Sequence, residues 1–130
     1  MTGKSLDRII CIAHSVALLS RYGSYRFGSA ILLGKRVISV GVNTRKTHPN
    51  GSGPNLAIHA ELDAARIAES RIGSIRGATI AIARAGRDDG YLPSFPCAGC
   101  FDMIRRKGLR RMLYIGNDLT PHYVDIGKDV

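Results

Sequence analysis

The chain alternates helix-length amphipathic segments with short apolar runs, and this alternation constrains its fold more than any other feature. Apolar residues recur at helical spacing over residues 5–20, where Ser5 can cap the helix. Two apolar runs of strand length follow, and the Gly34-Lys35 pair between them is typical of a tight hairpin turn. The predicted strands cover residues 30–33, 37–42, 78–83 and 111–115, and the two later helices cover residues 55–70 and 96–108.

This order, α-β-β-α-β-α-β, predicts an α/β fold in which a sheet is covered by helices. The hairpin makes the sheet mixed rather than purely parallel. We expect Asn55 to cap the second helix and Gly73 to follow its end, while Pro96 opens the third helix and Gly108 closes it. A chain of 130 residues fits one domain, which we assign to residues 1–130, with a tail after about residue 116 that shows no clear pattern.

The composition narrows the class of protein further. Hydrophobic residues make up 45% and charged residues 22% of the chain, which excludes intrinsically disordered and collagen-like classes. The 19 Lys and Arg against 10 Asp and Glu give a net charge of +9, which indicates a partner that carries negative charge, such as a nucleotide, a nucleic acid or an anionic surface. No apolar run approaches the roughly 20 residues of a membrane span, and the N-terminus lacks the apolar core of a signal peptide, so we expect no membrane association and a cytoplasmic location.

The three cysteines favour metal binding, catalysis or burial over a disulfide framework, because the count is odd and no secretion signal precedes them. Cys97 and Cys100 belong to the string Pro-Cys-Ala-Gly-Cys at residues 96–100, near the start of a predicted helix. Their i, i+3 spacing directs both thiols to one side, and a helix N-terminus favours the thiolates that a metal needs. Cys11 falls within the apolar pattern of the first helix, and we expect it to fill the core.

A second string, His-Ala-Glu at residues 59–61, lies near the start of the other predicted helix, residues 55–70. His59 and two thiolates supply three ligands to a tetrahedral zinc and leave its fourth position open, which is typical of a catalytic site. Glu61 can reach that position and exchange protons with water and a leaving group. A Cys-x-x-Cys pair by itself also suits a structural half-site or a redox pair, and His-x-Glu by itself says little. The two strings together favour catalysis.

The pattern His-x-Glu…Pro-Cys-x-x-Cys is the signature of the zinc-dependent nucleobase deaminases, and the sequence resembles that superfamily over about residues 5–116. The resemblance implies a three-layer cytidine deaminase-like sandwich, with a mixed sheet of four to five strands and helices on both faces. It also implies one catalytic Zn²⁺ per chain, held by His59, Cys97 and Cys100 between the N-termini of two helices. The implied reaction is hydrolytic replacement of an exocyclic amine, with Glu61 as the proton shuttle.

A histidine as the first ligand resembles the deoxycytidylate, tRNA-adenosine, yeast-type cytosine and polynucleotide cytidine deaminases. Three flanking segments are most similar to the deoxycytidylate deaminase branch, including its phage-encoded forms. The segments are residues 41–49, 77–79 and 108–111. This resemblance implies a nucleotide substrate such as dCMP. Typical members continue past the fourth strand with a helix and often a fifth strand, whereas residues 117–130 leave little room for either. We therefore expect the last crossover to be missing or reduced.

Four residues near the motifs are candidate substrate contacts. Asn43 matches the place where these families keep an asparagine that contacts sugar or base, although a turn residue is an alternative interpretation. Ala60 lies between the histidine ligand and the glutamate, so we expect it to line the substrate pocket. Arg45 and Lys46 can hold a 5′-phosphate or can belong to a solvated loop.

A basic and aromatic loop after the first helix raises a second hypothesis. Tyr25 and Arg26 lie where related folds border the active site, and they can close over one nucleotide or clamp a single strand. The alternative function is therefore a deaminase that acts on single-stranded DNA or RNA, and a third possibility is an inactive zinc domain that binds nucleic acid. Glu61 argues against the third. The densest basic cluster, at residues 105–111, is expected at the far end of its helix from the cysteines.

The chain also has features that predict self-association. Small members of the superfamily often associate, and a shortened C-terminal edge leaves a strand to cover. We expect a homo-oligomer that takes a small nucleotide as its substrate.

Overall fold

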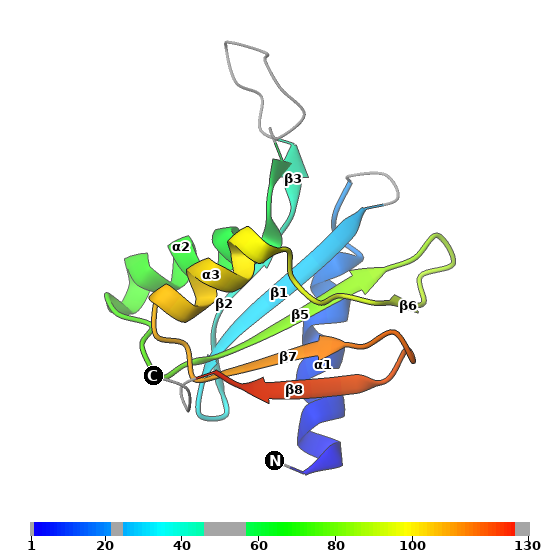
Figure 1. Ribbon diagram of the computed structural model, residues 1–130. Helices are drawn as coiled ribbons and strands as arrows, with labels where there is room; N and C mark the ends of the chain where they lie inside the picture. Colours follow the sequence, from blue (N-terminus) through cyan, green and yellow to red (C-terminus); the bar gives the residue numbers. More distant parts are fainter. Residues whose placement is uncertain (1, 22–24, 46–56, 127–130) are drawn as a thin grey trace.

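A computed structural model describes residues 2–21, 25–45 and 57–126 (Figure 1). Helices and short strands alternate along these residues in the predicted order, with additional short strands between them. The elements are α1 (Gly3–Ala17), β1 (Arg26–Leu33), β2 (Arg36–Val42), β3 (Thr44–Arg45), β4 (Ala57–Ile58), α2 (Ala60–Ile72), β5 (Thr79–Ala85), β6 (Tyr91–Leu92), α3 (Ala98–Arg106), β7 (Arg111–Ile115) and β8 (Pro121–Asp125).

The strands of the described residues form a six-stranded mixed sheet and a separate β3–β4 ribbon. The strand order in the main sheet is β2-β1-β5-β7-β8, and β6 pairs with the C-terminal end of β5. β1 runs antiparallel to both β2 and β5, whereas β5 and β7 are parallel and are joined through α3. The predicted mixed sheet is therefore confirmed, with five strands along its main path and β6 added to it.

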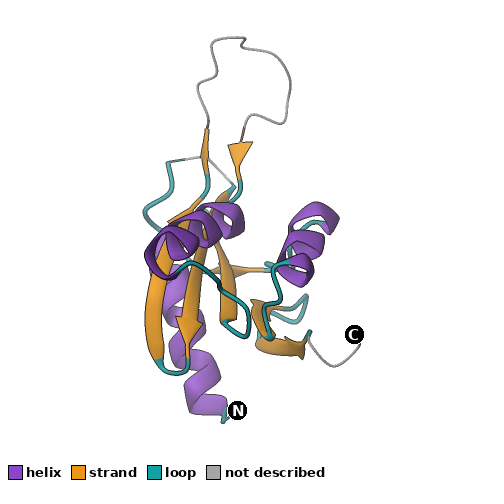
Figure 2. Ribbon diagram, turned by 90° about the vertical axis from the view of Figure 1, so that its left-hand side faces the viewer, coloured by secondary structure: helices purple, strands orange, loops and turns teal. Residues whose placement is uncertain are grey.

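The residues of β5 show how the sheet separates two cores. Ile80 and Ile82 pack into a cluster with residues of α2 and α3, whereas Ala81 and Ala83 pack against Ile10 of α1 on the opposite face. This alternation follows from the period of two in a strand. Figure 1 shows α1 behind the sheet and α2 and α3 in front of it, and Figure 2 shows α3 on the side opposite α1. The predicted three-layer sandwich is confirmed.

The helix starts differ from those predicted. Thr2, not Ser5, caps α1, because the Thr2 side chain accepts a hydrogen bond from the Ser5 N–H at 3.2 Å. α2 begins at Ala60, so the predicted cap Asn55 does not start this helix and lies outside the described residues. Pro96 does not open α3, because the extended backbone of Cys97 makes that residue the N-cap.

The helix ends agree better with the sequence. Gly73 follows α2 with φ 82°, and Gly108 follows the end of α3 with φ 76°. Both angles lie in the left-handed region, where glycine avoids the strain of a Cβ.

The C-terminal segment is ordered, contrary to the expectation of an unpatterned tail. β8 pairs antiparallel with β7, from Ile115 opposite Pro121 to Arg111 opposite Asp125. The expectation of little room for a further strand is wrong, because β8 is one. No crossover joins β7 to β8, because residues 116–120 are enough only for a hairpin, whereas a parallel strand needs a connection of about a dozen residues. The strand was not evident from the sequence because it mixes a proline, a histidine and an aspartate with only two large apolar residues.

The expectation that Cys11 fills the core is wrong, because this residue is exposed. The buried stripe of α1 consists of Ile10, Ala13, Val16 and Ala17, and Cys11 lies about 100° around the helix from Ile10. No described helix is long and apolar enough to cross a membrane.

Candidate active site

The three predicted ligands meet at the N-termini of α2 and α3. His59 is the N-cap of α2, Cys97 is the N-cap of α3, and Cys100 lies in the first turn of α3. The Nδ1 atom of His59 is 3.2 Å from Sγ of Cys100 and 3.8 Å from Sγ of Cys97, and all three donor atoms lie within 4.8 Å of one another. A tetrahedral zinc with bonds of about 2.0 Å to nitrogen and 2.3 Å to sulfur requires N···S separations of about 3.5 Å. The donor set therefore fits one zinc ion.

The backbone at both caps directs these side chains away from their own helices. His59 and Cys97 are extended, and neither side chain forms a capping hydrogen bond. Both helix N-termini contribute partial positive charge at the same place, which favours the thiolate form of the cysteines.

Glu61 lies beside the donor atoms and is almost fully buried, with 3% of its surface exposed. It opens, together with His59 and Cys97, into a pocket of about 360 Å³. A carboxylate, a donor set that fits zinc and a pocket of ligand size are thus combined in one site. The pocket is lined by Tyr25, Phe27, Asn43, His59, Ala60, Glu61, Phe95, Pro96 and Cys97.

Burial raises the pKa of the Cys100 thiol well above its usual range, and the negative charge and hydrogen bond of Glu61 raise it further. In the metal-free protein the thiol therefore holds its proton. A divalent cation bound by His59, Cys97 and Cys100 would supply the opposite charge and displace that proton. The Glu61 carboxylate, which suits proton transfer, thus also opposes ionisation of the Cys100 thiol when no cation is bound.

Two contacts hold the first turn of α2 against β2. Gly41 has no Cβ, and a Cβ there would lie 2.3 Å from the Ala64 nitrogen and 2.5 Å from the Ala60 oxygen. Next to it, the Val42 N–H donates to the Asp63 carboxylate at 3.2 Å. The helix that carries His59 and Glu61 therefore packs directly on the strand backbone.

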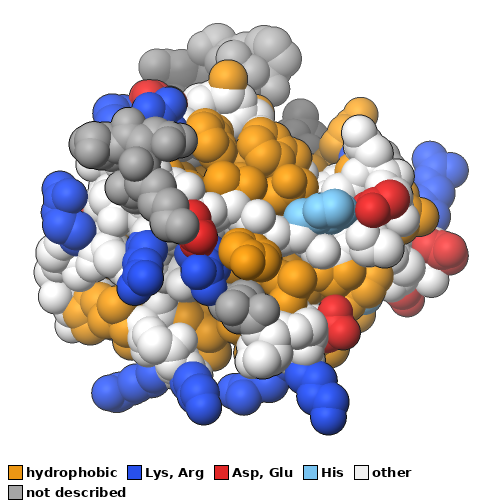
Figure 3. All heavy atoms as spheres, turned by 60° about the horizontal axis from the view of Figure 1, so that its bottom comes forward, with side chains coloured by type: hydrophobic (Ala, Val, Ile, Leu, Met, Phe, Trp, Pro, Cys, Tyr) orange, Lys and Arg blue, Asp and Glu red, His pale blue; other side chains and the backbone are white. Residues whose placement is uncertain are grey.

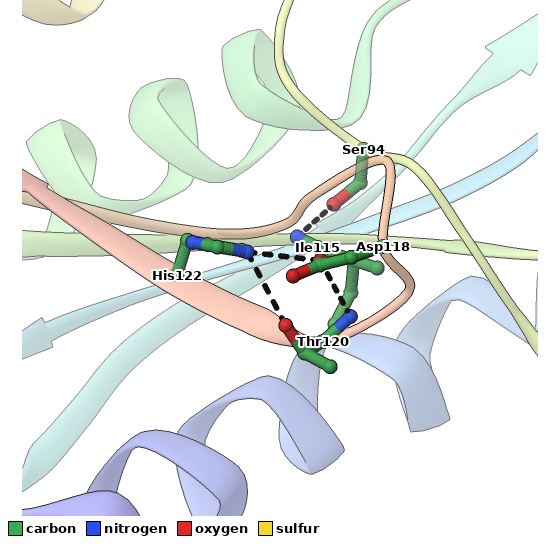
Figure 4. Close-up of polar contacts among 5 residues, drawn as sticks. All are labelled: Ser94, Ile115, Asp118, Thr120 and His122. Atoms are coloured by element: carbon green, nitrogen blue, oxygen red, sulfur yellow. Dashed lines mark hydrogen bonds and ion pairs between the residues drawn. The ribbon is translucent and has the colours of Figure 1, made fainter.

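Ser94 fixes the segment that leads into α3 (Figure 4). Its hydroxyl donates to the Ile82 carbonyl at 2.7 Å and accepts from the Ile115 N–H at 2.8 Å. Its own N–H donates to the Ile115 carbonyl at 2.9 Å. Ser94 therefore ties the approach to Cys97 to β5 and β7. No signal in the sequence distinguished Ser94 from an ordinary loop serine.

Asn43 lines the pocket, but its amide mainly holds neighbouring backbone. Its side-chain oxygen accepts hydrogen bonds from the Phe27 N–H and the Ser20 hydroxyl, both at 2.8 Å. Its side-chain nitrogen donates to the Tyr25 carbonyl. Among residues 2–21, 25–45 and 57–126, these contacts use one of the two amide hydrogens and leave one for a ligand.

The structure brings some of the other candidate residues to the pocket and not others. Ala60 and Tyr25 line it, and the Arg84 guanidinium lies 5.0 Å from the centre of the Tyr25 ring. Arg26 points to the turn between β5 and β6, where it forms an ion pair with Asp89 at 2.7 Å. Arg45 lies in β3, but its side chain is not described, and Lys46 lies outside the described residues.

The sequence singled out neither Phe27 nor Phe95, although both line the pocket. Phe95 is 53% exposed. It directly precedes the Pro-Cys string, and this adjacency is the sequence signal that could have identified it as a pocket residue.

Solved structures to which the chain is similar include deaminases. The cytidine deaminase from Burkholderia pseudomallei shares 20% identity with a TM-score of 0.70, over 98% of this chain and 94% of that one. The dCMP deaminase from the cyanophage S-TIM5 in apo form shares 18% identity with a TM-score of 0.65, over 85% and 81% of the two chains. Its complex with dCMP and dUMP gives 17% identity and a TM-score of 0.62, over 85% and 79%. These likenesses establish a common fold.

Comparison with curated proteins gave no significant match. The family model of the cytidine and deoxycytidylate deaminase zinc-binding region matches residues 4–116. This range includes the histidine, the glutamate and both cysteines of the site. The chain therefore belongs to the cytidine and deoxycytidylate deaminase family and is a zinc-dependent hydrolytic deaminase.

Proposed function

We propose that the protein converts the cytosine base of a nucleotide such as dCMP to uracil, with release of ammonia. The observation that carries this proposal is the meeting of Glu61 with the three donor atoms at one pocket of about 360 Å³. A cyanophage deaminase of the same fold was crystallised with dCMP and dUMP, which supports a nucleotide as the substrate.

The residues of the pocket have distinct parts in this reaction. His59, Cys97 and Cys100 would hold zinc, and zinc bound there would lower the pKa of water and so provide a nucleophile at neutral pH. Glu61 accepts the two protons of the attacking water in turn and delivers one to the ring nitrogen and the other to the departing amine. The water oxygen replaces the amine nitrogen on the ring, and the amine leaves as ammonia. The burial of Glu61 keeps competing solvent from its carboxylate.

Aromatic side chains form the wall that would receive the base. Tyr25, Phe27 and Phe95 offer flat apolar surfaces, and stacking on such rings is worth about 1–3 kcal/mol per base. Asn43 offers its remaining amide hydrogen to the base or sugar.

We also propose that Arg45 and Lys46 hold the 5′-phosphate. They follow Asn43 closely in the chain, and the arginine fork suits a phosphate group. Arg45→Ala should raise KM for dCMP much more than KM for deoxycytidine, and the exposed Arg66→Ala should change neither. Equal effects of Arg45→Ala on both substrates would remove this assignment.

A substrate panel tests the proposed function directly. Zinc-loaded protein is incubated separately with dCMP, CMP, deoxycytidine, cytosine and a single-stranded oligonucleotide. For each substrate, both the release of ammonia and the conversion of cytosine to uracil are measured. We expect the highest kcat/KM with dCMP or CMP. Turnover of the oligonucleotide without turnover of either nucleotide would overturn the proposal. Light scattering of the same sample tests whether the protein forms the expected homo-oligomer.

A further inference from the structure

The positive charge of the chain gathers at the end of the sheet that lies away from the catalytic pocket. Strand register places it there: Leu33 pairs with Arg36, Leu32 pairs with Thr79, and Thr79 pairs with Arg111. The pocket residue Phe27 lies at the other end of β1. Figure 3, which brings the bottom of the molecule forward, shows Lys and Arg side chains along this face. Part of the charge of +9 thus lies at a place that the active site does not explain.

A second pocket opens at this basic end, between the start of α1 and the β1–β2 turn. Its volume is about 280 Å³. Three cationic side chains line it together with a hydroxyl and apolar surface. The lining residues are Ser5, Arg8, Ile9, Leu32, Gly34, Lys35 and Arg111.

The three cations differ in how they are held. Arg111 forms an ion pair with Asp125 at 2.6 Å, and its guanidinium lies 4.8 Å from the centre of the Tyr123 ring. Arg8 and Lys35 are exposed and have no ion-pair partner within residues 2–21, 25–45 and 57–126. The pocket therefore has one fixed arginine and two cations whose charge no described carboxylate balances.

We propose that this pocket binds a phosphate group of an anionic ligand. Arginine forks donate paired hydrogen bonds to phosphate oxygens, and lysine adds a point charge. The Ser5 hydroxyl supplies a further donor, and Ile9 offers apolar surface to the uncharged part of the ligand. The site is separate from the catalytic pocket, so it does not depend on the proposed function.

Titration calorimetry with inorganic phosphate and pyrophosphate tests the site on the zinc-loaded full chain. The double variant Arg8→Gln/Lys35→Gln should weaken pyrophosphate binding at least tenfold, because both unbalanced charges are lost. Arg66→Gln removes an exposed arginine from α2 and should change binding less than twofold. Thermal melts of all variants verify that they are folded, and raising the salt concentration should weaken binding to the unsubstituted chain.

Two results would overturn the proposal. One is equal pyrophosphate binding by the unsubstituted chain and the double variant. The other is binding of an oligothymidylate without any binding of pyrophosphate, because the charge would then act as an extended surface rather than through this pocket. Binding of pyrophosphate and oligothymidylate that is lost together in the double variant supports the pocket and identifies a nucleic-acid backbone as one source of the phosphate.

Discussion

Replacement of Gly41 by alanine tests whether close packing of α2 on β2 positions the catalytic groups. The added Cβ would lie 2.3 Å from the Ala64 nitrogen, whereas ordinary contact begins at 3.4 Å. The atoms in its way belong to helix backbone and cannot rotate aside. The first turn of α2 must therefore move by about 1 Å, and His59 and Glu61 must move with it.

Gly28 provides a matched control on the same sheet. A Cβ at Gly28 would lie 2.3 Å from the Ala13 oxygen and 2.3 Å from the Ala17 nitrogen, so the clash is equal in size but displaces α1. Overpacking of this kind costs about 1–3 kcal/mol. For a chain of 130 residues, each kcal/mol lowers the melting temperature by about 4 °C, so both variants should melt about 4–12 °C lower.

The two variants should differ in function. A displacement of about 1 Å exceeds the tolerance of about 0.2 Å in metal–ligand distances, and such displacements can cost about 100-fold in rate. We expect Gly41→Ala to lower zinc affinity at least tenfold, measured by competition with a chelator, and kcat/KM by about 100-fold. Gly28→Ala should leave both within about threefold at temperatures well below its melting point. Equal loss of zinc affinity in both variants, or none in Gly41→Ala, would refute the reasoning.

Three further predictions follow from the site. Glu61→Gln should retain about one zinc per chain by metal analysis while kcat falls at least 100-fold, because a proton shuttle contributes about 10²–10⁴-fold; a fully active variant contradicts that role. Because the raised pKa keeps the Cys100 thiol of the metal-free protein protonated, zinc must displace its proton, and zinc affinity should still rise with pH above about 9, where a thiol with the ordinary pKa of about 8.5 has lost its proton; a profile that levels off there contradicts the raised pKa. Asn43→Ala leaves the Phe27 N–H without its acceptor and should cost about 1–3 kcal/mol in denaturant unfolding. Ser20→Ala should cost less, and an Asn43→Ala protein as stable as the unsubstituted chain would contradict the clamp.

The residues of the motifs were accessible to sequence reasoning because local geometry decides what they can do. The spacing of Cys97 and Cys100 puts both thiols on one side of a helix turn wherever that helix lies. Helix starts were less accessible: an extended backbone at His59 and Cys97, not a hydroxyl or a proline, begins the two motif helices. Long-range packing and a metal site override local capping preference at these positions.

Residues that act through tertiary contacts were not accessible. Ser94 matters because its hydroxyl lies between β5 and β7, two strands whose pairing appears only in the fold. Arg26 was expected beside the substrate from its place in the chain, but the turn between β5 and β6 brings Asp89 to it instead. Asn43 was expected as a substrate contact, and the structure adds that it supports the Tyr25 and Phe27 wall.

By itself, the sequence determined the class of fold, the three donor residues and the glutamate beside them. Hydrophobic periodicity and short-range spacing depend only on residues that are close in the chain, so they can be recognised in the sequence without the tertiary structure. The tertiary structure decided what depends on separate segments meeting: the aromatic walls of the pocket, the hairpin that ends the sheet and the place of the positive charge. That charge is spread along the sequence, and strand register together with the packing of α1 on the sheet brings Arg8, Lys35 and Arg111 to one pocket at the end opposite the catalytic groups.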